Sequence, residues 1–451
     1  MDDQLAEVEF GLARSKLAAL SPEYIVEVFQ HMQNALNYFL DSGNTERAVQ
    51  VGILPIFPRP GSLFDSVPMI EKLHGLVDDD DPMMGHVLAR HGNALGRETN
   101  DFETAATYLE KALEIARRNN DEELQVWTHI SAMNAGHNHL QLDWAEKHSS
   151  QALELTAKPS CPPTDRARAI LQSALMYTST GGIGEKFDLM QEALVAAERS
   201  GIKSNVVEAL WAAGMAHMSR GELTEALDAN ERGLMDYAVG GRLLSQRVQL
   251  DVYLGNFDSA WTHARRLDEA DQSIARSFVV RCSYAPCAAM YARATGDLSI
   301  LDGVIEKTRT VYENANVGAA WIQQGWAGVG LIAATQGDLD VCRDVYENSN
   351  LTPGKNVVAL PITTDRSLAI MAAALDRVYE AEQHLENAMK FTASGRNVPE
   401  YAWACSDYAE LLTERNADSD LERAAGLQEE AIEIAQRLGM KPLVERVVSQ
   451  R

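Results

Sequence analysis

A short phrase that recurs along this chain constrains its fold more than any other feature. In SRGELTEALDANERGL, Gly221 is followed by an acidic residue, Leu223, two spacers and Ala226. Related phrases return at Gly255, Gly296 and Gly337. Glycine tolerates the left-handed backbone that ends a helix, and the Asp, Glu or Asn after it can cap the next helix. Each phrase therefore predicts a tight antiparallel helical hairpin, in which the alanine lets the two helices approach closely.

The spacing of the turns predicts a stack of such hairpins. They recur roughly every 40 residues, at Asn100, Leu140, Gly181, Gly221, Gly255, Gly296, Gly337 and Asp376. A single hairpin cannot bury its apolar face alone, so its neighbours must cover it and the core becomes continuous along the stack. We therefore expect an all-α fold, an α-solenoid whose stacked hairpins wind into a right-handed superhelix.

Composition agrees with a large soluble chain and excludes several classes of protein. The 451 residues are 46% hydrophobic and 23% charged, with only 14 prolines, which favours a helical globular protein over a disordered one. A net charge of -25 repels the phosphate backbone of nucleic acids. The five scattered cysteines, the lack of an 18-residue apolar run and the acidic start MDDQLAEVEF indicate a reducing compartment and no membrane span. We expect a cytoplasmic protein with no direct nucleic-acid partner.

The best single unit runs from Val206 to Leu234. Its small residues Gly214, Gly221, Ala226 and Gly233 have a spacing that resembles the tetratricopeptide consensus. This resemblance implies one array over 1–451, made of N-terminal helical repeats with a proline-rich loop (1–81), central repeats (82–397) and a capping repeat (398–451). We interpret PIFPRPGSLF (55–64) and LTPGKNVVALPITT (351–364) as loops between repeats, with VVALPI as an extended segment rather than a strand.

Motifs that would carry chemistry are missing from the sequence. It has no GxxxxGK[ST] phosphate loop, no GxSxG elbow and no HExxH zinc helix. Gly328, Gly330 and Ala333 match a GxGxxA dinucleotide fingerprint, but the expected helix 319–335 already contains them, and close helix packing explains the glycines. We expect no cofactor, no metal and no catalysis.

Three further groups of residues have a structural interpretation beside a functional one. His137 and His139 suggest a metal site, but residues two apart on a helix point in different directions, and a polar cluster at a helix end fits better. Cys282 and Cys287 fit buried thiols in an apolar helix. The acidic run 78–81 resembles a calcium loop only in its charge, and we interpret it as a solvated turn before a helix.

The C-terminal segment 398–451 resembles the closing part of tetratricopeptide regions in large bacterial signalling ATPases. These include LuxR-type regulators of the maltose-regulator kind and class III nucleotide cyclases with an appended ATPase. The resemblance rests on Glu400, Ala402, Trp403, Cys405, Asp407, Tyr408, Ala409, Leu438, Gly439, Met440, Pro442, Leu443, Glu445 and Arg446. Because this chain lacks a P-loop, a cyclase core and a helix-turn-helix, those activities are not carried over. What the resemblance implies is a sensor or scaffold array, either free-standing or part of a longer protein.

Two functional classes remain open at this level. The first is a binding module, in which the first helix of each hairpin lines a concave groove that holds a protein, a peptide or a small effector. In tetratricopeptide arrays the first helix of each pair faces the groove, and the resemblance therefore implies that these side chains point into it: Arg90, Trp127, Asn134, His137, Arg168, Trp211 and Gln324. Arg90 and Arg168 would suit an acidic peptide or an anionic effector. The alternative for Trp127 and Trp211 is that they fill gaps between helices. The second class is an enzyme whose site converges only in three dimensions.

The hairpin interpretation makes a prediction about packing. We expect Ala226 and Gly214 to be buried between the paired helices of one repeat, so Ala226→Leu should overpack that contact. The expected loss of stability is about 1 to 3 kcal/mol, measured as a lower midpoint in thermal or chemical unfolding. An unchanged midpoint would mean that the hairpin is misplaced.

Overall fold

The computed structural model describes most of the chain. It covers residues 2–19, 25–54, 66–158, 161–236, 241–273, 278–312, 318–360, 362–394, 397–417 and 419–450. The predicted proline-rich loop at 55–64 lies outside these residues. Within them, helices hold 83% of the residues, and the one β contact is an isolated bridge between Asn356 and Thr363. The segment VVALPI therefore forms no strand in the residues described.

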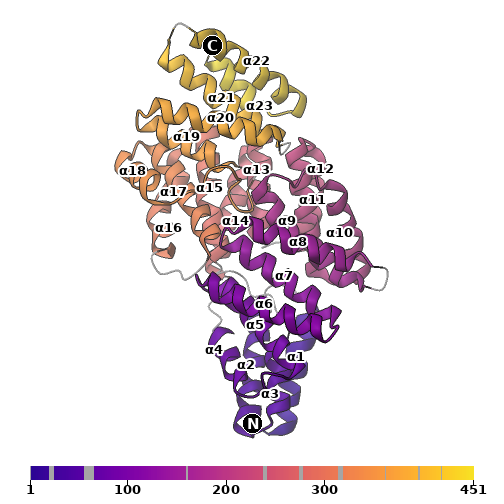
Figure 1. The fold of residues 1–451 in the computed structure, drawn as a ribbon. Coiled ribbons are helices and arrows are strands. Elements are labelled where there is room, and N and C mark those ends of the chain that lie inside the picture. The colour runs from indigo at the N-terminus through magenta and orange to yellow at the C-terminus, as the bar shows by residue number, and fades with distance from the viewer. Residues whose placement is uncertain are drawn as a thin grey trace.

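The helices follow one another as antiparallel hairpins and build a solenoid from the N-terminus at one end to the C-terminus at the other (Figure 1). Most hairpins join an odd-numbered helix to the even-numbered helix after it. The elements are α1 (Asp3–Ala19), α2 (Ile25–Asp41), α3 (Thr45–Gly52), α4 (Ser66–His74), α5 (Pro82–Glu98), α6 (Phe102–Arg118), α7 (Glu122–Asn138), α8 (Leu142–Thr156), α9 (Pro163–Thr180), α10 (Phe187–Ser200), α11 (Lys203–Arg220), α12 (Leu223–Asp236), α13 (Gly241–Leu254), α14 (Phe257–Ser273), α15 (Phe278–Thr295), η2 (Leu298–Leu301), α16 (Val304–Tyr312), α17 (Ala319–Gln336), α18 (Leu339–Asn348), α19 (Thr364–Ala374), α20 (Val378–Ser394), α21 (Val398–Arg415), α22 (Asp420–Leu438) and α23 (Lys441–Ser449). The predicted fold class, an all-α solenoid of tetratricopeptide-like hairpins, is confirmed.

The predicted turns have the backbone that the repeated phrase requires. Left-handed φ angles between 58° and 81° occur at Leu140, Gly181, Gly221, Gly255, Gly296, Gly337 and Asp376. After Gly337, Asp338 accepts a hydrogen bond from the amide of Val341 and so caps α18. Asn100 differs, because α5 ends in an extended residue, Thr99. The turn after Gly296 also differs, since the short helix η2 precedes α16.

Two glycines of the GxGxxA pattern, Gly328 and Gly330, allow neighbouring helices to pack closely. A Cβ atom on Gly328 would lie 2.6 Å from Pro286 of α15, and one on Gly330 would lie 2.2 Å from the sulfur of Met371 on α19. Both glycines are interior to α17. The packing interpretation is confirmed, because any side chain at these positions would push the neighbouring helices apart.

Gly214 has a different neighbour from the one that we expected. Ala226 is fully buried, as predicted. A Cβ on Gly214, however, would meet the side chain of Gln246 on α13, at 2.8 Å. Gln246 donates to the carbonyl of Trp211 on α11 and accepts from Asn230 on α12. Gly214 therefore makes room for the next repeat, because this glutamine occupies the junction of three helices.

The array curls back on itself, so that late repeats contact early ones. The indole nitrogen of Trp321 on α17 donates to Asn138 at the end of α7, over 3.0 Å. The turn at Gly221 lies against Leu438 of α22, and the turn at Gly255 lies against Pro442 of α23. One hydrophobic cluster accordingly extends from α7 to α23. This closure fills much of the interior that an open superhelix would leave as a groove.

The loop between α18 and α19 contributes to this closure from inside. Most of its residues from Lys355 to Leu360 are buried. Asn356 donates from its backbone to the carbonyl of Ser179 at 2.8 Å and from its side chain to that of Thr178 at 2.7 Å, both at the end of α9. The predicted inter-repeat loop is thus a buried connector between the two halves of the array.

A buried ionic cluster joins the C-terminal repeats around Asp407 of α21. Its carboxylate accepts hydrogen bonds from Arg366 of α19 at 2.7 Å and from Arg446 of α23 at 2.8 Å, and Arg293 of α15 lies 3.3 Å away. Arg366 also binds Glu400, two turns earlier on α21, at 2.9 Å. Burial raises the pKa of Asp407, but the three guanidinium groups, Arg366 foremost, outweigh burial and hold that pKa well below its usual range.

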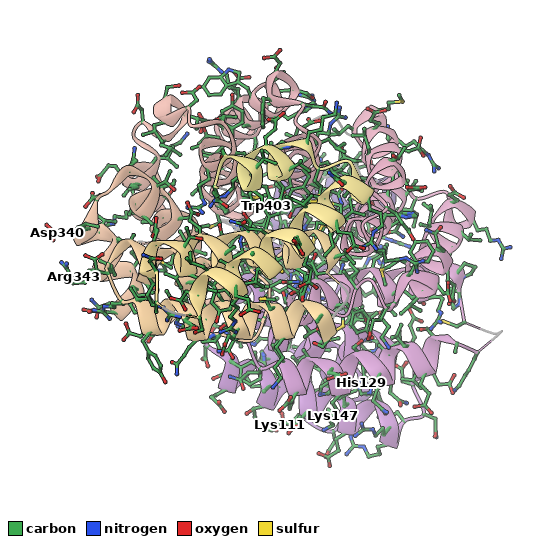
Figure 2. All side chains as sticks on the ribbon, turned by 90° about the horizontal axis from the view of Figure 1, so that it is seen from above. Lys111, His129, Lys147, Asp340, Arg343 and Trp403 are labelled. Atoms are coloured by element: carbon green, nitrogen blue, oxygen red, sulfur yellow. The ribbon has the colours of Figure 1, made fainter. Side chains whose placement is uncertain are left out.

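Trp403 of α21 completes this cluster near the centre of the molecule as seen in Figure 2. The guanidinium groups of Arg366 and Arg446 lie 5.3 and 5.9 Å from its ring centroid, within the range of cation–π attraction. Glu400, Trp403, Asp407 and Arg446 all belong to the segment whose sequence resembles the closing repeats of signalling arrays. Their shared role in this structure is to hold the last helices together.

Because a buried ion pair is costly to break from one side, Asp407→Asn is expected to destabilise the protein by about 3 to 5 kcal/mol. The amide keeps the shape of the carboxylate but leaves the guanidinium groups without their shared charge. A matched control is Asp340→Asn, since Asp340 pairs with Arg343 at 3.2 Å but is 97% exposed, at the edge of the view in Figure 2. Its expected change is below about 1 kcal/mol. Equal effects of the two substitutions on the unfolding midpoint would contradict the role given to Asp407.

Candidate functional site

A cavity of about 390 Å³ lies at the N-terminal end of the array. It lies between α1 and α3 on one side and α5, α7 and α9 on the other. Its lining is Phe10, Arg14, Arg47, Gln50, Ile53, Leu54, His86, Glu123, Leu124, Val126, Trp127, Ile130, Asp165 and Arg168. A volume in this range suits a small organic molecule, and an apolar lining with a few charged groups is typical of ligand sites.

The helix α7 supplies the apolar wall of the cavity. Asp121 accepts a hydrogen bond from the amide of Leu124 and so caps this helix at its first turn. Trp127 follows about one turn after Leu124 and Ile130 about two turns after it, and both residues line the cavity. His86 on α5 lies 3.3 Å from the same Asp121. The cap of α7 therefore also fixes the rim of the cavity on the α5 side.

The opposite wall comes from the first helices of the chain. The guanidinium groups of Arg14 and Arg47 lie 5.8 and 5.4 Å from the ring centroid of Phe10. Arg47 is held by Glu7, with 2.7 Å between Nε and Oε1, and by Gln50. Arg14 forms no ion pair with any residue in the part of the chain that the structure describes. Arg14 is thus the cation of this wall whose charge is not already matched.

Arg168 of α9 closes the third side. A carboxylate oxygen of Asp165, one turn earlier, lies 3.8 Å from its guanidinium group, and the side chain of Arg168 is 29% exposed. Burial lowers the pKa of Arg168, and Asp165 opposes that shift. The lining as a whole carries three arginines against Glu123 and Asp165. Because Glu7 already pairs with Arg47, the charge of Arg14 is the one in this lining that most favours an anionic group.

Of the groove residues predicted from the sequence, the structure brings Trp127 and Arg168 together in this cavity. The others are buried inside the molecule and line no open groove: Arg90, Asn134, His137, Trp211 and Gln324. That part of the predicted groove is wrong. Closure of the superhelix accounts for part of this burial, because α17 packs against α7 and α21 packs against α11.

The buried members of the set make contacts within the protein. The ring of His137 is 2.9 Å from the hydroxyl of Ser179, and Gln324 donates to Ser283 at 3.2 Å. Arg242 stacks over Trp211, with 5.2 Å between its guanidinium carbon and the ring centroid. Trp211 therefore fills space between helices, which is the alternative that the sequence left open for it.

Sequence reasoning missed Phe10, Arg14 and Arg47, which form the second wall. A turn phrase does lie at Gly43 and Asn44, where Gly43 has a left-handed φ of 74° and Asn44 caps α3, but the predicted repeat phase begins only at Asn100 and does not reach the first helices. The pairing of α1 with α7 and α9 also joins residues that lie far apart along the chain. No local signal in the sequence marks these side chains as neighbours of Trp127.

Other expectations of the sequence can be compared with the described residues directly. Cys282 and Cys287 are fully buried, as predicted, and burial raises the pKa of Cys287 to about 12. Asp81 caps α5, so the acidic run precedes a helix as expected.

Within the described ranges, no group of three or more His, Cys, Asp or Glu side chains is arranged to hold a metal ion. In the same ranges, no helix has the length and hydropathy of a membrane span.

Comparisons with known proteins do not assign this chain to a family. Neither a protein-family profile nor a curated protein matches the chain. Among solved structures, the chain is similar to yeast Tom70 (14% identity, 100% of this chain and 96% of that chain, TM-score 0.33). It is also similar to a human IFIT1 dimer with m7Gppp-AAAA (14%, 96% and 95%, 0.44) and to the APC/C hetero-tetramer Cut9-Hcn1 (11%, 97% and 90%, 0.34). Because the sequence identities are 14% or lower and the TM-scores lie below 0.5, this likeness assigns no ligand to the chain.

Several buried histidines surround this end of the array. His74 and His91 lie 2.8 Å apart between ring nitrogens, and His129 of α7 lies 2.9 Å from His148 of α8. Figure 2 shows His129 and Lys147 at the same edge of the molecule. Burial, with help from nearby cations, lowers the pKa of His91 and His129 to about 4 and that of His137 and His148 to about 3.

These shifts make stability depend on pH. The folded-state pKa values lie below the unfolded value near 6.5, so between pH 6.5 and about 4 the unfolded chain binds protons that the folded chain does not. Stability is therefore expected to fall on acidification, by about 1 kcal/mol per histidine between pH 7 and 5.5. Urea unfolding at several pH values measures this slope. His148→Gln removes one proton site and should make the slope shallower, whereas a stability that is flat from pH 7 to 5.5 would contradict the assignment.

Proposed function

We propose that this protein is a non-catalytic binding module that holds a small organic anion in the cavity between α1, α3, α5, α7 and α9. The observation that carries the proposal is the meeting of Trp127, Arg14 and Arg168 around a volume of about 390 Å³. The apolar wall suits a hydrophobic or aromatic body. The guanidinium groups suit a carboxylate, sulfonate or phosphate, which they bind in a bidentate fashion.

A sensor or scaffold role is part of the same proposal. The resemblance of 398–451 to closing repeats of bacterial signalling arrays supports a place in cytoplasmic signalling or transcriptional regulation, where the effector would occupy the array and a protein partner would respond. The net charge of -25 supports partners other than nucleic acid. An enzyme with a site assembled from several repeats is the competing class. The cavity favours binding, since its acidic residue Asp165 lies beside Arg168 rather than in an isolated acid–base pair.

The probe for this proposal is 1-anilinonaphthalene-8-sulfonate, an aromatic anion whose fluorescence rises in apolar sites. We expect saturable binding by the folded protein, and at least a tenfold weaker affinity in the double variant Arg14→Glu, Arg168→Glu, which is about 1.4 kcal/mol. Trp127→Ala should weaken binding as well, because it removes the aromatic wall. Circular dichroism establishes that each variant is folded.

The matched control is Arg118→Glu, which makes the same charge change on the exposed end of α6. It should leave the affinity unchanged. If the cavity variants bind the probe as tightly as the wild type while remaining folded, the cavity is not the binding site. If the control weakens binding equally, net charge rather than the cavity governs the effect.

A further inference from the structure

Two charged side chains of the N-terminal cavity have no partner within the described protein. They are Arg14 of α1 and Glu123 of α7, and both line the cavity. Neither side chain forms a hydrogen bond or an ion pair with any residue that the structure describes, and the two do not pair with each other. Both residues are exposed, so a ligand can reach them from solvent. The cavity thus presents one unmatched charge of each sign.

The other charged and amide side chains of the lining all have partners. The pairs are Arg47 with Glu7, Gln50 with Arg47, His86 with Asp121 at 3.3 Å, and Arg168 with Asp165 at 3.8 Å. Pairing within the protein is therefore the rule in this lining, and Arg14 and Glu123 depart from it. Because they belong to opposite walls of the cavity, the space between them is open to a ligand.

Each of these charges lies one helical turn from an aromatic side chain of the same wall. On α1, Phe10 precedes Arg14 by four residues, and the guanidinium carbon lies 5.8 Å from the ring centroid. On α7, Trp127 follows Glu123 by four residues. Residues at this spacing share a helix face, and all four of these residues line the cavity. Each wall therefore presents an aromatic ring and a charge, and the sign of the charge differs between the walls.

This arrangement favours a ligand that carries charges of both signs. A molecule with only an anionic group would match Arg14 but would leave the carboxylate of Glu123 without a partner, and a molecule with only a cationic group would do the reverse. A guanidinium group donates two parallel hydrogen bonds to a carboxylate, and an ammonium group donates to a carboxylate as well. An aromatic ring packs favourably against other rings in offset or edge-to-face geometry. The four side chains together therefore match a zwitterion that carries a ring.

We propose that the ligand of this cavity is a small zwitterion with an aromatic body, the class to which the aromatic amino acids belong. Its carboxylate binds Arg14, its ammonium group binds Glu123, and its ring lies between Phe10 and Trp127. This ligand class rests on the function proposed above, because both concern the same cavity. The volume of about 390 Å³ is large enough for a molecule of this kind.

Isothermal titration calorimetry at neutral pH, with three probes that share one ring, tests the ligand class. Phenylalanine carries both charges, 3-phenylpropanoate carries only the carboxylate, and 2-phenylethylamine carries only the ammonium group. Each charge-assisted contact strengthens binding, so phenylalanine is expected to bind about tenfold more tightly than either of the other probes. If 3-phenylpropanoate binds as tightly as phenylalanine, the zwitterion is the wrong class and the anion site proposed above still stands.

Two conservative variants separate the roles of the two charges. Glu123→Gln should weaken the binding of phenylalanine about tenfold and strengthen that of 3-phenylpropanoate, because a like charge is removed from beside its carboxylate. Arg14→Gln should weaken the binding of both of these probes and strengthen that of 2-phenylethylamine. Circular dichroism establishes that both variants are folded. A purely structural role would change the affinity for all three probes in the same direction, and that result would overturn the proposal.

The matched control is Glu122→Gln, which makes the same change of charge at the adjacent residue. Glu122 is outside the lining of the cavity, and its carboxylate pairs with Lys158. This control should keep the preference for phenylalanine, and loss of the preference there would mean that net charge governs it and would overturn the proposal. Binding of 1-anilinonaphthalene-8-sulfonate but not of phenylalanine would overturn the zwitterion class alone. If neither molecule binds, the function proposed for the cavity fails as well.

Discussion

A helical hairpin has two apolar faces and can cover only one of them with its own helices, so each hairpin depends on a neighbour. This chain meets that requirement twice. Successive hairpins stack along the solenoid, and the array also curls until its late repeats cover its early ones. The hydrogen bond between Trp321 and Asn138 and the buried loop around Asn356 mark this second contact. The ionic cluster at Asp407 then holds the last helices in the position that the closure needs.

Closure decides where a ligand can bind. In an open array the first helices of the hairpins would share one long groove, whereas here α17 packs against α7 and α21 packs against α11. What remains at the N-terminal end is a cavity bounded by α1 and α3, where Trp127 and Arg168 lie opposite Phe10 and Arg14. The same folding buries His137 and Trp211. The proposed cavity site thus exists because residues far apart in the chain are brought together.

The distribution of charge supports this division of roles. Acidic residues outnumber basic ones by 65 to 40 in the chain, yet the described interior contains several arginines. At Asp407 the guanidinium groups find carboxylate partners, and the result is a structural contact. In the N-terminal cavity Arg14 forms no ion pair with any described residue, and we infer a ligand site there. The difference lies in whether the positive charge is matched within the protein.

The sequence by itself determined the fold class, the places of most turns and the packing role of Gly328 and Gly330, because these depend on local backbone conformation and on a period read along the chain. It also pointed to Trp127 and Arg168, through the phase of the repeat. It could not give Arg14 or Phe10 as their neighbours, nor predict that Arg90, Asn134, His137, Trp211 and Gln324 are buried. Those facts depend on the curvature of the stack, which arises from small rotations summed over many repeats. Only the tertiary structure decided which helices meet across the interior and which side chains surround the N-terminal cavity.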